Sequence, residues 1–194
     1  MIVVSDTTPL ISLLKINRLD LLERLFGKVF IPDAVFHELT VDERFQLEAD
    51  QIKKKKFIEV KSINHPESAS ILKRATGLDQ GESEAIVLTD ELKADLILMD
   101  EAKGRKVSAQ MGFQIMGTIG ILMAAYEEQE LTAEEARECI DGLQRAERHI
   151  GPVSYTHLST DAKARIRGCN EKNRGAAALK ANGGNNEQRK KSVC

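Results

Sequence analysis

Near its N-terminus the chain reads IVVSDTTPL (residues 2–10), a short β-rich run followed by an acidic residue and a helix start. Asp6 directly follows the apolar residues, and Thr8 precedes a proline, as at many helix N-termini. The run LILMD (residues 96–100) repeats this order in the clearest buried strand of the chain, with Asp100 at its end. Both runs predict a strand whose carboxyl end carries a carboxylate.

Strand-like and helix-like segments alternate through the first 150 residues. The other expected strands lie at residues 29–31, 57–60 and 113–116. The segments between them have helical spacing of apolar residues, and a last amphipathic helix is expected at about 132–146, where Thr132 and Glu135 have capping-box spacing. This alternation predicts an α/β fold with a mostly parallel central sheet between two helical layers, a three-layer α/β/α domain.

The composition favours one domain, expected at residues 1–150. With 194 residues and 42% apolar content, the chain is long enough for one substantial core. No apolar run has the length of a membrane span and no signal segment is recognisable, so a cytoplasmic protein is expected. The three cysteines lack the spacing of a zinc site and offer no disulfide framework.

Residues 151–194 differ from the rest and are expected to form a disordered tail. Apolar periodicity disappears there, and the tail holds 9 of the 28 Lys and Arg but 3 of the 30 Asp and Glu, leaving 19 − 27 = −8 for the first 151 residues. The run PVSYTHL (residues 152–158) resembles a translated transposase end used in sequencing libraries, so the tail is expected to be non-native.

Four acidic residues lie where a strand-like run gives way to a helix: Asp6, Glu38, Glu82 and Asp100. In a parallel sheet such junctions gather along one edge, where ligands bind. Crowded carboxylates repel one another by about 4 kcal/mol per close pair at an effective dielectric of about 20, so such a cluster normally needs a cation. Mg²⁺ or Mn²⁺ suits oxygen ligands and phosphate chemistry, which makes metal-dependent cleavage of a nucleic acid the leading hypothesis.

Each of these acids also has a purely structural interpretation. Asp6 can bond locally in a turn, and Asp100 can cap the next helix. Glu38, on a helix that starts near Pro32, can lie on a solvated face, and Glu82 can form a capping pair with Asp79. Asp6 and Asp100 are expected to share a divalent ion, because both end strong strands.

Residues near these four acids offer alternative ligands or have two possible roles. Glu84 and Glu101 are alternative ligands, Thr8 is either a helix cap or a group that orients Asp6, and His37 is expected on the surface. Three cations follow Asp100, and they contact either RNA phosphates or neighbouring acids: Lys103, Arg105 and Lys106.

Five stretches together resemble the PIN-domain nucleases, in particular the PIN-like group of the domain-of-unknown-function type related to VapC-type toxins. They are VVSDTTPL (3–10), IPDAVFHEL (31–39), GESEAI (81–86), LMDEAKGR (98–105) and MGTIG (116–120). The resemblance implies an α/β/α fold and a Mg²⁺- or Mn²⁺-dependent endoribonuclease, often the toxin of a toxin-antitoxin pair. It also implies RNA as substrate, with an antitoxin protein and a second copy of the chain as possible partners.

The same resemblance favours Glu38 and Glu82 as ligands. Members commonly carry two aspartates where this chain has Asp100 and Glu101, which leaves the choice between these two open.

Other functions fit the sequence less well. A haloacid-dehalogenase-like phosphatase needs a second aspartate where Thr8 stands, and a receiver domain needs adjacent acids after the first strand. The main alternative is a PIN-like module that binds RNA or a protein without cutting.

Overall fold

In a computed structural model, which describes residues 1–41 and 52–148, five short strands form one parallel sheet. The strands are β1 (Val3–Ser5), β2 (Val29–Ile31), β3 (Ile58–Val60), β4 (Leu96–Leu98) and β5 (Ile115–Met116). Their order is β3-β2-β1-β4-β5, and every neighbouring pair is parallel. Each strand lies where the sequence predicted one, because the apolar runs are too short for a typical helix and are bounded by turn signals.

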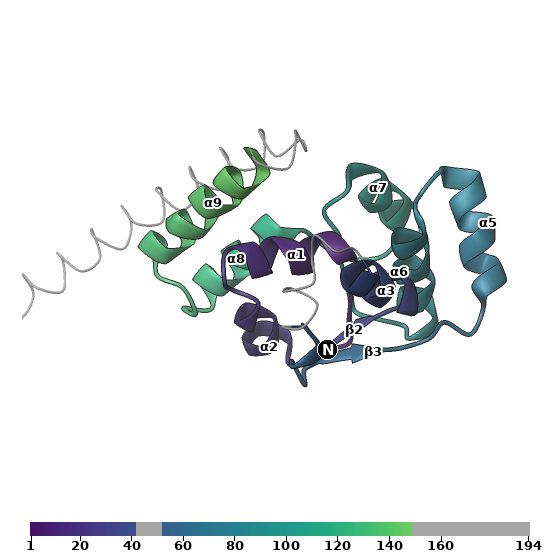
Figure 1. Cartoon of the computed structure of the whole chain (residues 1–194), viewed down its shortest axis with the longest axis horizontal. Helices are drawn as coiled ribbons and strands as arrows, with labels where there is room; N and C mark the ends of the chain where they lie inside the picture. Colours follow the sequence, from purple (N-terminus) through teal and green to yellow (C-terminus); the bar gives the residue numbers. More distant parts are fainter. Residues whose placement is uncertain (42–51, 149–194) are drawn as a thin grey trace, which may run out of the picture.

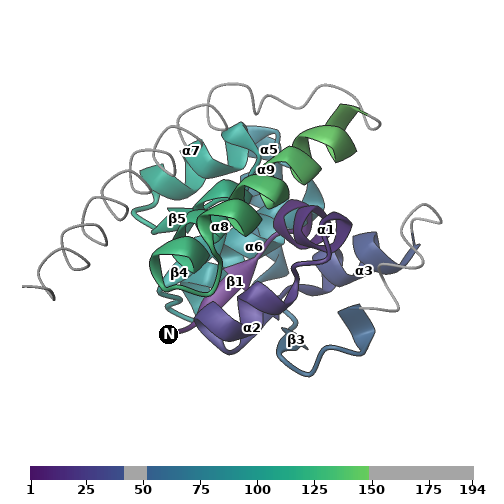
Figure 2. The ribbon, with the colours of Figure 1, turned by 90° about the vertical axis from the view of Figure 1, so that its left-hand side faces the viewer.

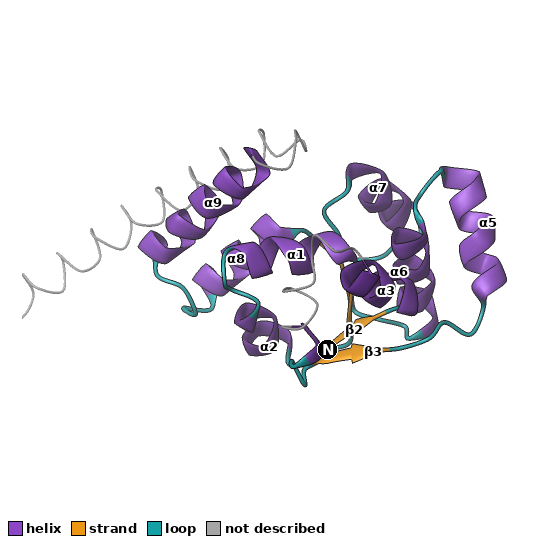
Figure 3. Cartoon of the chain, in the orientation of Figure 1, coloured by secondary structure: helices purple, strands orange, loops and turns teal. Residues whose placement is uncertain are grey.

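Helices cover both faces of this sheet (Figures 1 and 3). One side carries α1 (Thr7–Lys15), α2 (Asp20–Phe26), α8 (Thr118–Glu127) and α9 (Ala133–Arg148). The other side carries α5 (Pro66–Thr76), α6 (Gln80–Glu91) and α7 (Ala102–Gln110), while α3 (Asp33–Val41) packs against α6. The three-layer α/β/α architecture predicted from the alternation of segments is confirmed.

Alternate residues of the central strands supply two separate cores. Val3 and Leu98 pack with the layer of α1, α2, α8 and α9, whereas Val4, Ile97 and Met99 pack with α6 and its neighbours. This follows from the two-residue period of a strand, which sends successive side chains to opposite faces. Strands buried on both faces read as continuous apolar runs, which is why the sequence located them so clearly.

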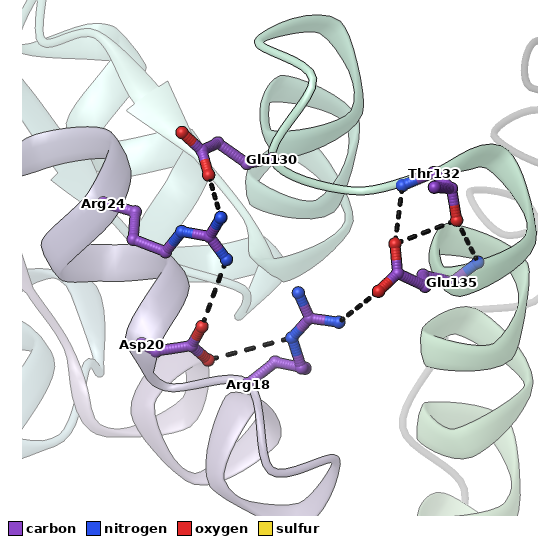
Figure 4. A network of polar contacts seen from close by, with 6 residues as sticks. All are labelled: Arg18, Asp20, Arg24, Glu130, Thr132 and Glu135. Carbon is purple, nitrogen blue, oxygen red and sulfur yellow. Dashed lines mark hydrogen bonds and ion pairs between the residues drawn. The ribbon is translucent and has the colours of Figure 1, made fainter.

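Helix α9 packs across α8 and α1 (Figure 2) and is anchored at its N-terminus by polar contacts (Figure 4). Thr132 and Glu135 form the predicted capping box, with bonds of 2.8 Å from Thr132 N and 3.2 Å from Glu135 N. Arg18 lies 3.9 Å from Glu135, and Arg24 pairs with Glu130, so α2 and the loop before it hold the start of α9 and the turn that precedes it. The hydrogen bonds from Thr132 lower the pKa of the Glu135 carboxyl.

Two helix starts differ from expectation. Helix α1 begins at Thr7, so Asp6 rather than Thr8 occupies the N-cap position. The sequence also predicts a helix at about residues 105–111, and this helix, α7, begins earlier, at Ala102. The sequence also predicts a charged helix at 41–56, but most of this segment lies outside the described residues. The whole tail at 151–194, with its expected non-native origin, lies outside them as well. None of the helices in the described ranges is long and apolar enough to cross a membrane.

Candidate active site

A pocket of about 300 Å³ opens beyond the carboxyl ends of β1 and β4. The chain leaves β1 for β2 on one side, while β4 lies on the other, so this is the topological switch point where open α/β sheets bind ligands. The start of α1, the loop before α6 and the start of α7 supply the lining residues: Asp6, Thr8, Gly77, Asp79, Glu82, Glu101 and Lys103.

Asp6 is the most deeply buried carboxylate of the pocket, with 3% of its surface exposed. Its backbone N–H donates to Leu98 O at 3.0 Å, which fixes it to the neighbouring strand β4. Burial is the main cause that raises the pKa of Asp6 to about 8. The bond from the Thr7 N–H opposes it, and the nearby carboxylates of Asp79, Glu82 and Glu38 contribute to the increase. A rigid and crowded acid of this kind indicates a functional site.

Glu82 lies in the same pocket, in the first turn of α6, and one of its oxygens has no partner. Its Oε2 accepts from Asp79 N at 3.0 Å, and its own N–H donates to Asp79 Oδ1 at 2.8 Å, which completes a capping box. Its Oε1 is buried and has no hydrogen-bond donor among the described residues. Burial raises the pKa of Glu82, and the carboxylates of Asp79 and Glu101 add to this. The bond from the Asp79 N–H and the charge of Lys103 oppose it.

Glu38 reaches the edge of this site from α3. Thr7 Oγ1 donates to its Oε2 at 2.5 Å, and Gly81 N donates to its Oε1 at 3.2 Å. Burial raises the pKa of Glu38, and these two bonds lower it again. Helix α3 therefore brings Glu38 beside the pocket, although Glu38 does not line it.

Asp100 and Glu101 take different positions. Asp100 caps α8 from the loop after β4, because its Oδ1 accepts from Thr118 N at 2.7 Å and its Oδ2 accepts from Thr118 Oγ1 at 2.5 Å. Glu101 is exposed and lines the pocket together with Asp6 and Glu82. Of the two acids between which the sequence left the choice open, Glu101 is thus the one that faces the other carboxylates.

The three cationic side chains that follow Asp100 also lie in different surroundings. Lys103 Nζ lines the pocket and donates to Gly77 O at 2.9 Å, linking α7 to the loop before α6. Arg105 Nη1 donates to Met99 O at 2.9 Å and supports the end of β4, whereas Lys106 is exposed on α7. Lys103 is the cation placed to meet a phosphate at the pocket.

The structure brings Asp6 and Glu82 together, places Glu38 next to them and directs Asp100 toward α8. The sequence predicts Asp79 only as a helix cap. In the structure its side chain caps α6 and also lines the pocket, because the start of α6 lies at this edge of the sheet. The expected surface position of His37 is confirmed, and Thr8 lines the pocket.

The donors fit a hard divalent cation. They are carboxylate oxygens, and the unpaired buried Glu82 Oε1 faces a glycine, Gly104, at which an added Cβ would lie 2.9 Å from that oxygen. Within residues 1–41 and 52–148, no three acidic, histidine or cysteine side chains already converge on one point where a metal ion could sit. The arrangement is therefore a set of oxygen donors that a cation would draw together.

Comparison with known proteins identifies the family. A family model described as PIN domain matches residues 2–164. The match continues past residue 150, the predicted end of the domain. No curated protein matches the chain. PIN domains generally use divalent metals, in agreement with the carboxylate donors of this pocket. The chain belongs to the PIN-domain family and is a nuclease-type hydrolase module.

Proposed function

We propose that this protein is an endoribonuclease that depends on Mg²⁺ or Mn²⁺. The observation that carries the proposal is that Glu82, whose Oε1 is buried and unpaired, lines the same pocket as Asp6. A buried carboxylate oxygen without a donor costs free energy unless something binds it, and burial already favours the protonated form of both acids. A divalent cation relieves both penalties at once.

In this proposal Asp6 and Glu82 hold the metal, with Glu38 and either Asp100 or Glu101 completing the set. When bound there, a divalent ion would supply Lewis-acid chemistry for hydrolysis of the phosphodiester bond. Lys103 supplies a positive charge at the same pocket for the phosphate backbone, and Thr7 and Gly81 keep Glu38 in place. No covalent bond between RNA and enzyme is needed.

The proposal is tested with the full chain and a single-stranded RNA, with a DNA of the same sequence in parallel. Cleavage of RNA is expected with Mn²⁺ or Mg²⁺ and is expected to stop when the metal is chelated. Glu82→Gln should abolish cleavage, because it removes the charge that the cation needs. Glu67→Gln, on the exposed surface of α5, is the matched control and should cleave at the wild-type rate.

Two outcomes separate this proposal from its alternative. Wild-type protein that binds RNA tightly but does not cut it under any metal condition would favour a non-cleaving PIN-like binding module. Cleavage that persists in Glu82→Gln would place the chemistry elsewhere. The toxin role, the antitoxin and the homodimer implied by the resemblance stay predictions. Co-expression with neighbouring genes tests the toxin and antitoxin roles, and measurement of the oligomeric state tests the homodimer.

A further inference from the structure

Helices α3 and α6 each bind a backbone N–H of the other through a glutamate. Glu38 Oε1 on α3 accepts from the N–H of Gly81, the second residue of α6, at 3.2 Å. Glu84 Oε2 on α6 accepts from the N–H of Ala34, the second residue of α3, at 3.0 Å. The first N–H groups of a helix have no partner within it, and carboxylates suit its positive end. We call this pair of hydrogen bonds the reciprocal cap.

The spacing of the four residues places both bonds at one helix contact. Ala34 and Glu38 are four residues apart on α3, and Gly81 and Glu84 are three apart on α6, so each pair lies on one face of its helix. Gly81 permits the close approach, because a Cβ there would lie 2.7 Å from Glu38 Oε1. These two hydrogen bonds therefore join the facing sides of α3 and α6.

The contacts of Glu84 distinguish its role from that of a metal ligand. Its Oε2 bonds Ala34 and its Oε1 accepts from Gln80 Nε2 at 2.9 Å, so protein donors occupy both oxygens. It does not line the pocket. Protein donors hold both oxygens of Glu38 as well, but one of them is Thr7, the residue next to Asp6. The Glu38 carboxylate is also close enough to Asp6 to raise its pKa.

We infer that Glu84 is a positioning residue, which fixes α3 against α6 and thereby holds Glu38 beside the pocket. The inference rests on the proposed function, since it assigns Glu38 to the metal site. Partners that orient ligands typically change metal affinity by about 10–100-fold when they are removed. The reciprocal cap predicts an effect of that size at a residue that touches no metal.

Three variants of the full chain test this. Glu84→Ala removes the acceptor, and Glu84→Gln keeps an oxygen for the Ala34 N–H. Glu91→Ala is the matched control, because Glu91 ends the same helix and accepts from Asn64 N at 2.8 Å and His65 N at 2.9 Å at the start of α5, away from the pocket. Mn²⁺ affinity is measured by calorimetry, and hydrogen exchange of the Ala34 and Gly81 amides by NMR.

Glu84→Ala should weaken Mn²⁺ binding at least tenfold and speed exchange at Gly81 as well as at Ala34, while Glu84→Gln and Glu91→Ala bind Mn²⁺ like wild type. Equal losses in Glu84→Ala and Glu84→Gln would overturn the inference and make Glu84 a direct ligand. Wild-type affinity in Glu84→Ala would also overturn it. Wild-type protein that binds no Mn²⁺ would instead overturn the proposed function, and Gly81 exchange would then decide whether the reciprocal cap positions Glu38.

Discussion

Asp100 and Thr118 are joined by two hydrogen bonds, of 2.7 Å from the Thr118 N–H and 2.5 Å from its hydroxyl. Gly117, the N-cap residue of α8, has no side chain with which to cap the helix, so Asp100 supplies the acceptor from the loop after β4. An added Cβ at Gly117 would lie 2.7 Å from Asp100 Oδ1, so the glycine also makes room for this acid. Asp100 therefore has a structural role that does not require a metal.

Replacing Asp100 with alanine should lower the free energy of unfolding by about 1–2 kcal/mol, the usual cost of losing a helix cap. Thr118→Val, which keeps the N–H but removes the hydroxyl, should cost less. Urea unfolding of metal-free protein measures both changes. If Asp100 served only as one more repelling carboxylate at the site, its removal would raise stability, and that result would exclude the capping role.

Gly104 on α7 has no room for a side chain. An added Cβ would overlap Met99 Sδ and lie 2.9 Å from Glu82 Oε1. Gly104→Ala should therefore destabilise the protein by about 1–3 kcal/mol, as overpacking usually does, although alanine favours a helix by about 1 kcal/mol.

The control for this change is Gly142→Ala on α9, where the new Cβ would lie 3.1 Å from Ile16 Cγ2 and intrude less. Thermal melts should show a clear loss for Gly104→Ala and a smaller change for Gly142→Ala. A Gly104→Ala protein as stable as wild type would mean that Glu82 and Met99 are free to move away.

Stability should also depend on pH in a way that reports Asp6. The pKa of Asp6 is about 8 in the folded chain, against 3.8 for the exposed carboxyl. Between these values the folded chain keeps a proton that the unfolded chain has released, so the free energy of unfolding of metal-free protein falls as pH rises from about 4 to about 8. The total is on the order of a few kcal/mol.

Urea unfolding across this pH range measures the effect. Asp6→Asn should show a shallower fall than wild type, and a remaining fall is expected because the pKa values of Glu38 and Glu82 are raised as well. Identical slopes in the two proteins would contradict the burial of an ionisable Asp6.

The sequence predicted the sheet well because each strand is a short apolar run, such as Leu96–Leu98, with turns on both sides. It also placed Asp6 correctly at the carboxyl edge, since a residue that directly follows a buried strand has little freedom. Parallel pairing of β1 with β4 then brings the ends of these two strands together.

The rest of the site depends on contacts that no local pattern contains. Glu38 meets Gly81 across 43 residues of chain, and nothing in either stretch shows that their helices touch. The choice between Asp100 and Glu101 depends on how the loop after β4 turns toward α8. Asp79 was interpreted as a cap alone, because the capping pattern with Glu82 explained it without the pocket.

The central claim is that Asp6 belongs to a divalent-metal site, and calorimetric titration of Mn²⁺ into wild-type protein and Asp6→Asn tests it most directly. Asparagine keeps the shape of Asp6 and removes its charge. The account predicts Mn²⁺ binding to wild type that is lost or greatly weakened in Asp6→Asn. The melting temperature of metal-free protein should hold or rise, because asparagine needs no proton uptake on folding, whereas the buried Asp6 does at neutral pH. Equal Mn²⁺ affinity in the two proteins, or a less stable Asp6→Asn with unchanged affinity, would contradict it.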